Sequence, residues 1–211
     1  MAFPPYKSTD ADTAEPWTLE NRIGFFDLER DKKENAYASP LYRFNLGIPH
    51  HLEIVTEFEN RPDLKQMGKA NVGFKWIPLV GPWSAGIETL AHLPVKEHGG
   101  PGMEGSVLLT VPKDNLRLHV NAGGFTDNGP VERESGWMSG AIMEAYFGRL
   151  RPGLEFFAKQ TAFEPVQASL DPGLIVDFGL FDARMGTRFG LTDAAPTLAG
   201  TLWVTFKLPA R

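Results

Sequence analysis

Residues 115–125 read Asn-Leu-Arg-Leu-His-Val-Asn-Ala-Gly-Gly-Phe, and this stretch decides the fold. Leucine, valine and alanine occupy its even positions from 116 to 122, whereas Arg117, His119 and Asn121 occupy the odd positions between them. Side chains alternate between the two faces of a β-strand. The stretch therefore predicts a strand that is apolar on one face and polar on the other.

The same alternation recurs along the chain and predicts about twelve strands. The 22 Gly and 17 Pro fall mostly at the breaks between these segments, as an all-β protein requires. The predicted strands are 18–28, 38–48, 51–60, 67–77, 83–93, 103–111, 115–125, 136–147, 151–161, 168–179, 182–191 and 197–208. No helical pattern is available to cover either face. We therefore expect an all-β fold, a closed antiparallel up-and-down barrel over residues 18–211, preceded by an irregular, Pro-rich and acidic arm over residues 1–17.

The connections between the predicted strands are alternately short and long. Short ones lie at 47–50, 78–82, 112–115, 148–151 and 180–182, and longer polar ones at 29–36, 60–66, 95–102, 126–135 and 161–168. In a meander, alternate connections lie at opposite ends of the sheet. One rim should carry tight turns and the other long loops, which is typical of transmembrane barrels. The alternative is a soluble meander barrel with long, irregular connections at one rim.

The two predicted faces differ in chemistry. One is rich in Leu, Val, Phe and Trp, and the other carries most of the mid-strand charge in a nearly balanced mixture of acids and bases. In a membrane barrel the apolar face meets lipid and the charged face lines the lumen, where opposite charges can pair. The predicted lumen residues are Arg43, Glu53, Glu57, Lys75, Glu88, His92, Arg117, His119, Asn121, Glu144, Glu155, Lys159, Asp177, Arg184 and Arg188. Aromatic residues near strand ends, including Trp76 and Trp83, favour the membrane reading because they form interfacial girdles.

Composition excludes several classes of protein. The net charge of −5 and the lack of a basic run argue against a nucleic-acid partner, and the absence of Cys excludes disulfides and thiol catalysis. No apolar run approaches the ~20 residues of a membrane helix. The opening Met-Ala-Phe-Pro-Pro is not a secretory signal peptide. Either the protein stays inside the cell, or this is a mature chain with an added start codon. For a membrane barrel we expect the second, a bacterial outer-membrane chain from which the signal peptide has been removed.

Catalytic and metal chemistry find little support in the sequence. His119 lies beside Asn121 on the charged face without a neighbouring serine, so a lumen hydrogen bond is the favoured role. The spacing of His50, His51, His92 and His98 fits no common metal motif. We therefore predict no enzyme, no metal and no cofactor.

Several short pieces, taken in order, carry a family resemblance. They are residues 8–16 (Ser-Thr-Asp-Ala-Asp-Thr-Ala-Glu-Pro), 17–20 (Trp-Thr-Leu-Glu), 41–48 (Leu-Tyr-Arg-Phe-Asn-Leu-Gly-Ile), 68–75 (Gly-Lys-Ala-Asn-Val-Gly-Phe-Lys), 91–94 (Ala-His-Leu-Pro), 118–123 (Leu-His-Val-Asn-Ala-Gly) and 173–177 (Gly-Leu-Ile-Val-Asp). With them the chain resembles the outer-membrane barrel family of the meta-pathway of phenol degradation, also described as transporters. The resemblance implies a monomeric barrel of about twelve strands with a channel for hydrophobic small molecules.

The leading hypothesis is an outer-membrane channel for small, hydrophobic or aromatic molecules, with the lipid bilayer and such solutes as its partners. One alternative is a non-conducting barrel that serves as an accessory subunit of an envelope complex. Another is a soluble ligand-binding barrel with the apolar face inside. In the arm, the acidic residues Asp10, Asp12 and Glu15 are expected to dock on basic lumen residues as a partial plug.

Overall fold

The computed structural model describes residues 5–30, 35–61, 66–93, 101–128, 133–162 and 164–209 of the chain. Its strands are β1 (Thr18–Arg30), β2 (Asn35–Ala38), β3 (Leu41–Ile48), β4 (Leu52–Arg61), β5 (Gln66–Leu79), β6 (Ser84–His92), β7 (Gly102–Lys113), β8 (Leu116–Asn128), β9 (Arg133–Ala145), β10 (Leu150–Thr161), β11 (Gln167–Asp177), β12 (Phe181–Gly190) and β13 (Leu198–Pro209). None of the described segments forms a helix long and apolar enough to span a bilayer.

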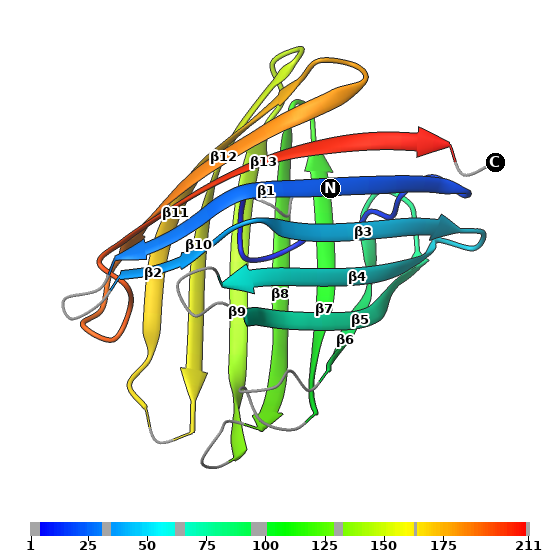
Figure 1. Ribbon diagram of the computed structural model, residues 1–211. Helices are drawn as coiled ribbons and strands as arrows, with labels where there is room; N and C mark the ends of the chain where they lie inside the picture. The colour runs from blue at the N-terminus through cyan, green and yellow to red at the C-terminus, as the bar shows by residue number, and fades with distance from the viewer. Residues whose placement is uncertain are drawn as a thin grey trace.

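The strands form one antiparallel sheet that closes on itself (Figure 1). From β3 to β13 each strand pairs with the next one in the sequence, as in a meander. Closure comes from β1 and β13, whose register runs from Thr18 opposite Pro209 to Arg30 opposite Leu198. The predicted closed up-and-down barrel is confirmed.

The strands β2 and β3 occupy one position in the wall. β3 pairs with Leu19–Gly24 of β1, and β2 pairs with the continuation of the same strand from Asp27 to Arg30. The barrel therefore has twelve strand positions around its axis, as predicted. The predicted single strand at 38–48 is interrupted at Ser39 and Pro40, where proline offers no N–H to the ladder.

The two ends of the barrel differ in their connections. On one side, a tight turn follows every second strand. The turn at Asn115, for example, joins β7 to β8. At the opposite rim, the predicted long connections contain residues 31–34, 62–65, 94–100, 129–132 and 163, which lie outside the described part of the chain. We call the two ends the turn side and the loop side.

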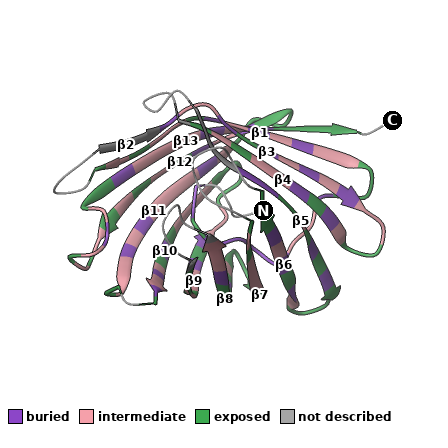
Figure 2. Ribbon diagram, turned by 60° about the horizontal axis from the view of Figure 1, so that its bottom comes forward, coloured by how far each residue is buried: buried purple, intermediate pink, exposed green. Residues whose placement is uncertain are grey.

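The outer face is apolar and the inner face is charged, the reverse of a soluble protein. Buried and exposed positions alternate along the strands (Figure 2). Val107, Phe156 and Phe74 are 62%, 47% and 41% exposed on the outside. On the inside, the charged side chains of Glu53, Lys75 and Glu144 are completely buried. Exposed tryptophans lie near both rims, with Trp17, Trp76 and Trp83 on the turn side and Trp137 towards the loop side.

The inner face also carries apolar residues that the sequence argument did not assign to it. Val55, Ile77, Leu108, Ile142 and Ile175 are each at most 1% exposed. Val55 lies between Glu53 and Glu57 in strand β4, all three at alternate positions on one face. The lumen is therefore a mixed surface, and part of it can pack against an apolar side chain.

Candidate functional site in the barrel lumen

The predicted lumen residues, apart from Asp177, lie on the inner face. Most pair there with opposite charges: Arg43 donates to the carboxylates of Glu57 and Glu88, and the Lys75 ammonium lies 3.6 Å from Glu88. Asp177 is a correction. It is exposed at the end of β11, where its carboxylate accepts the N–H of Gly179 at 2.7 Å. The strand ends there, so the carboxylate caps a turn instead of facing the lumen.

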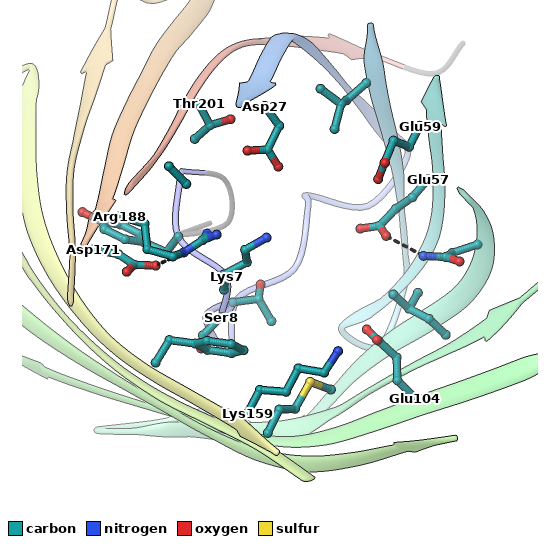
Figure 3. Close-up of a pocket in the computed structure, with 18 of the residues that line it drawn as sticks. Lys7, Ser8, Asp27, Glu57, Glu59, Glu104, Lys159, Asp171, Arg188 and Thr201 are labelled. Carbon is teal, nitrogen blue, oxygen red and sulfur yellow. Dashed lines mark hydrogen bonds and ion pairs between the residues drawn. The ribbon is translucent and has the colours of Figure 1, made fainter. Parts of the chain in front are cut away.

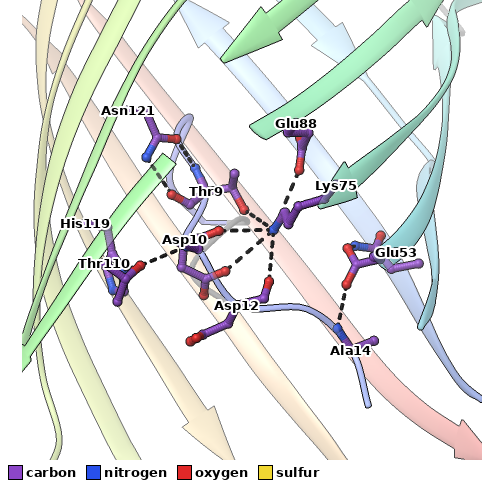
Figure 4. A network of polar contacts seen from close by, with 12 residues as sticks. Thr9, Asp10, Asp12, Ala14, Glu53, Lys75, Glu88, Thr110, His119 and Asn121 are labelled. Carbon is purple, nitrogen blue, oxygen red and sulfur yellow. Dashed lines mark hydrogen bonds and ion pairs between the residues drawn. The ribbon is translucent and has the colours of Figure 1, made fainter. Parts of the chain in front are cut away.

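The arm, residues 5–16, runs inside the barrel (Figure 4). From Trp17 on the turn side it passes back into the lumen, where the Ala14 N–H donates to Glu53 of β4 at 2.6 Å. It then crosses to Thr110 of β7, which accepts the Ala11 N–H at 2.8 Å, and reaches β10 at Glu155. The arm thus follows the inner wall from one side of the barrel to the other.

Side chains of the wall bind the arm mainly at the backbone groups of the arm. Glu155 accepts the successive N–H groups of Lys7 and Ser8 at 2.6 and 2.8 Å. The Asn121 side chain accepts the Thr9 N–H at 2.8 Å and donates to the Thr9 carbonyl at 2.7 Å. An amide side chain has one acceptor and one donor group, so it can satisfy both backbone groups of one residue.

Lys75 donates hydrogen bonds to carbonyl oxygens of the arm. Its ammonium donates to the Thr9 hydroxyl at 2.8 Å and to the carbonyls of Asp10 and Asp12 at 3.2 and 3.3 Å. It also lies 3.6 Å from the Asp10 carboxylate. A buried ammonium needs such partners, because desolvation without them is costly.

Apolar arm residues fill the apolar part of the lumen. Ala11 packs with Ile77 and Leu108, and Tyr6 packs with Ile142. Burial, with the nearby carboxylates of Glu144 and Glu155, raises the pKa of the Tyr6 phenol well above its usual value. The phenol therefore stays neutral, as a residue inside an apolar contact should.

Glycines make room for the arm. A Cβ atom at Gly173 would lie 2.7 Å from the Tyr6 ring, and one at Gly186 would lie 2.9 Å from Pro5. A Cβ at Gly140 would overlap the Ser8 hydroxyl. These glycines come from β11, β12 and β9, so the wall is hollowed along the path of the arm.

The acidic arm residues behave differently from one another. Asp10 is buried against Lys75, and Asp12 accepts Arg117 Nη1 at 2.8 Å in a half-exposed pair. Glu15 is exposed near the turn side, and its carbonyl accepts the Thr18 N–H at 3.0 Å. Two of the three carboxylates predicted to dock therefore contact lumen cations.

A buried chain of polar contacts lies under the arm. The Thr110 hydroxyl, which accepts the Ala11 N–H, lies 2.9 Å from His119 Nδ1, and His119 Nε2 lies 3.5 Å from Glu144. Because the Thr110 hydroxyl accepts from Ala11, its own proton is free to be donated to His119 Nδ1. His119 and Glu144 are completely buried, so the arrangement orients Thr110 towards the arm.

A cavity of about 510 Å³, which we call the vestibule, lies on the loop side of the arm (Figure 3). Arm residues 5–9 line it, together with the loop-side halves of the strands. Its carboxylates outnumber its fixed cations. The acids are Asp27, Glu29, Glu57, Glu59, Glu88, Glu104, Asp127, Glu134 and Asp171, and the bases are Lys7, Arg43, Lys159 and Arg188.

Several vestibule charges are held by neighbours on the wall. Arg188 donates to Asp171 and to Glu29, both at 2.9 Å. His92 lies 3.3 Å from Glu104 and from Asp127, and the Lys159 ammonium lies 4.3 Å from the centre of the Phe125 ring. In the described part of the chain, no group of three or more His, Asp or Glu side chains is arranged to hold a metal ion.

Sequence reasoning missed several lumen residues. Asp171 pairs with Arg188, Asp182 pairs with Arg184, and the Thr110 hydroxyl holds the arm. The alternation in the sequence could have identified Asp171. It shares one face of β11 with Gly173 and Ile175, at alternate positions of the strand. Asp182 stands at the junction of the predicted turn 180–182 and the predicted strand 182–191, and the structure makes it the second residue of β12.

Comparison with known proteins identifies the fold. No family model and no curated protein sequence matches the chain. The solved NanC porin superimposes with a TM-score of 0.67 at 11% identity, covering 90% of this chain and 100% of that one. A porin refined at 1.8 Å and a loop-deletion mutant of OmpT, an outer-membrane protein of Vibrio cholerae, both share 7% identity over 90% of this chain, with TM-scores of 0.49 and 0.39 and coverage of 99% and 98% of their own lengths. The chain therefore has the closed β-barrel fold of the NanC porin.

Proposed function

We propose that this chain is an outer-membrane channel for small molecules and that the arm closes it. A wall that is apolar outside and charged inside suits a barrel surrounded by lipid. The observation that carries the proposal is the arm itself: it crosses the lumen and separates the vestibule from the turn side. Withdrawal of the arm would join the two sides.

For the solute, we propose small hydrophobic or aromatic molecules that also carry polar groups. The vestibule offers aromatic surfaces from Phe125, Phe157 and Trp203 beside its carboxylates. Such a mixture binds a molecule with an aromatic body and a polar end, because a pocket usually combines apolar area with a few polar groups. The family resemblance points to the same class of solute.

The test is conductance in planar lipid bilayers, with the full chain compared with a variant that lacks residues 1–16. The arm-deleted barrel should conduct several-fold more than the full chain at the same salt concentration and in the same lipid. Uptake of a small phenolic solute by liposomes should rise in parallel, with a large sugar as the excluded control. Equal conductance of the two proteins would contradict closure by the arm.

A second candidate function is a non-conducting barrel that serves as a subunit of an envelope complex. The paired charges of the lumen and the arm inside it favour this candidate. Silence of both proteins in the bilayer, with normal folding in lipid, would support it over the channel. Extraction of the chain from cells without detergent would instead support a soluble barrel.

A further inference from the structure

The groups that hold the arm form a defined surface on the inner wall, which we call the arm seat: Glu53, Lys75, Thr110, Asn121 and Glu155. Between described residues, the seat makes five hydrogen bonds to N–H groups of the arm, at residues 7, 8, 9, 11 and 14. It makes three more to carbonyls, at residues 9, 10 and 12. These eight bonds involve atoms that nearly every peptide possesses.

The geometry of the seat is that of a peptide-binding surface. Asn121 bonds the N–H and the carbonyl of the same residue, as a neighbouring β-strand would. Backbone hydrogen bonds of this kind supply affinity in peptide recognition, while pockets for side chains supply specificity. Here the side-chain requirements follow the path of the arm. Tyr6 and Ser8 fit against glycines of the wall, and Ala11 and Ala14 are small and buried. Acidic residues of the arm face Lys75 and Arg117.

We propose that the arm seat is a binding site for peptides, and that the arm is the peptide it holds at rest. The site takes the segment from Lys7 to Ala14, whose chain bends at Ser8 and Ala11. It accepts small residues opposite Ile77 and Leu108, and an acidic residue opposite Lys75. This inference rests on the proposed channel, because a peptide from solution reaches the seat only after the arm has left.

The tether explains why the arm occupies the seat in the intact chain. Attachment to β1 gives the arm an effective concentration in the millimolar range, which a dilute free peptide cannot match. Removal of the arm leaves the backbone-binding groups without those partners. Buried polar groups that lose their partners favour a new ligand with the same donors and acceptors.

The experiment uses the arm-deleted barrel in planar bilayers and a synthetic peptide with the sequence of residues 5–16, added to both compartments. We expect the peptide to reduce the conductance to the level of the full chain. The same peptide methylated at the backbone nitrogens of Thr9, Ala11 and Ala14 keeps its side chains but loses three donors. It should need at least about tenfold more peptide for the same block, because each lost hydrogen bond to the seat removes part of the binding energy.

Two matched controls separate the seat from unspecific blocking. Methylation at Thr13, whose N–H bonds no described residue, should leave the block close to that of the unmodified peptide. In the barrel, Asn121→Ala with Glu155→Gln should weaken the block at least about tenfold, whereas Glu59→Gln, at the vestibule wall, should not change it.

Three results would overturn the peptide site. They are an open arm-deleted barrel that the peptide does not block, equal block by a scrambled peptide, and equal block by the triply methylated peptide. Each of them would leave closure by the arm intact. If the arm-deleted barrel conducts no more than the full chain, the closure proposed above fails instead, and the peptide site fails with it.

Discussion

The strands that carry the arm seat also line the vestibule, but the two regions differ in how far some of their charged side chains are buried. Glu53, Lys75 and Glu155 in the seat are completely buried, and each has an arm group as a partner. In the vestibule, Glu57 and Asp127 keep about a fifth and two fifths of their side chains exposed. Charges can be buried only where partners replace water. In the arm seat the arm supplies those partners, whereas other buried charges, such as Arg184 with Asp182, are paired within the wall.

The largest effect is expected at Lys75, a buried charge of the arm seat whose partners include groups of the arm. Replacing it by Met leaves Asp10 and Glu88 buried without their ammonium partner, and breaking a buried pair costs about 3–5 kcal/mol. We expect a loss of about 3 kcal/mol in the free energy of unfolding from lipid vesicles, since release of the arm relieves part of the cost. Adding Asp10→Asn should recover part of that loss; a double variant as unstable as K75M would contradict the pairing.

The contrast also requires that the outside of the wall meets lipid. Val120 is exposed on the outer face, and an arginine there should cost about 2–4 kcal/mol near the bilayer midplane. Guanidinium unfolding in vesicles measures this cost. Ser106→Arg is the control, because Ser106 lines the acidic vestibule, and its effect should be far smaller. Normal folding of Val120→Arg in lipid would reverse the assignment of the faces.

Glycine substitutions distinguish the seat from the vestibule by space alone. A Cβ at Gly140 overlaps Ser8 of the arm, whereas one at Gly105 meets nothing closer than 3.7 Å. Gly140→Ala should displace the arm at a cost of about 1–3 kcal/mol and raise the conductance towards that of the arm-deleted barrel. Gly105→Ala should conduct like the unmodified chain. Protease cleavage within the arm, monitored by mass spectrometry, should increase only in Gly140→Ala.

The smallest expected effect is at the half-exposed pair of Asp12 and Arg117. Pairs of this kind contribute about 0.2–1 kcal/mol and are screened by salt. Asp12→Asn should therefore raise the conductance slightly at low salt and not at high salt. Asp10→Asn, at a buried position, should keep its effect at both salt concentrations, and identical salt dependence of the two variants would argue against their different burial.

Much of the wall could be predicted from the sequence. The alternation at 115–125 predicted β8 within three residues of its bounds, Leu116–Asn128, and assigned Arg117, His119 and Asn121 to one face. A period of two is a local property, so each strand carries it independently. The prediction was weaker at strand ends: the predicted strand 168–179 extends past Asp177, whereas β11 ends at Asp177, which caps a turn. Whether a residue there belongs to a turn or to a strand depends on the register with its neighbours.

The sequence by itself determined the twelve strand positions, the two faces and an acidic arm that cannot join the ladder. Only the tertiary structure decided where the arm lies. Glu53, Thr110, Asn121 and Glu155 come from β4, β7, β8 and β10, and barrel closure brings them around one segment. The same closure explains the apolar residues of the lumen, since Ile77, Leu108 and Ile142 pack against Ala11 and Tyr6. A contact across the lumen depends on the register and tilt of every strand that lies between the two residues. A local pattern in the sequence contains no information on that combined register and tilt.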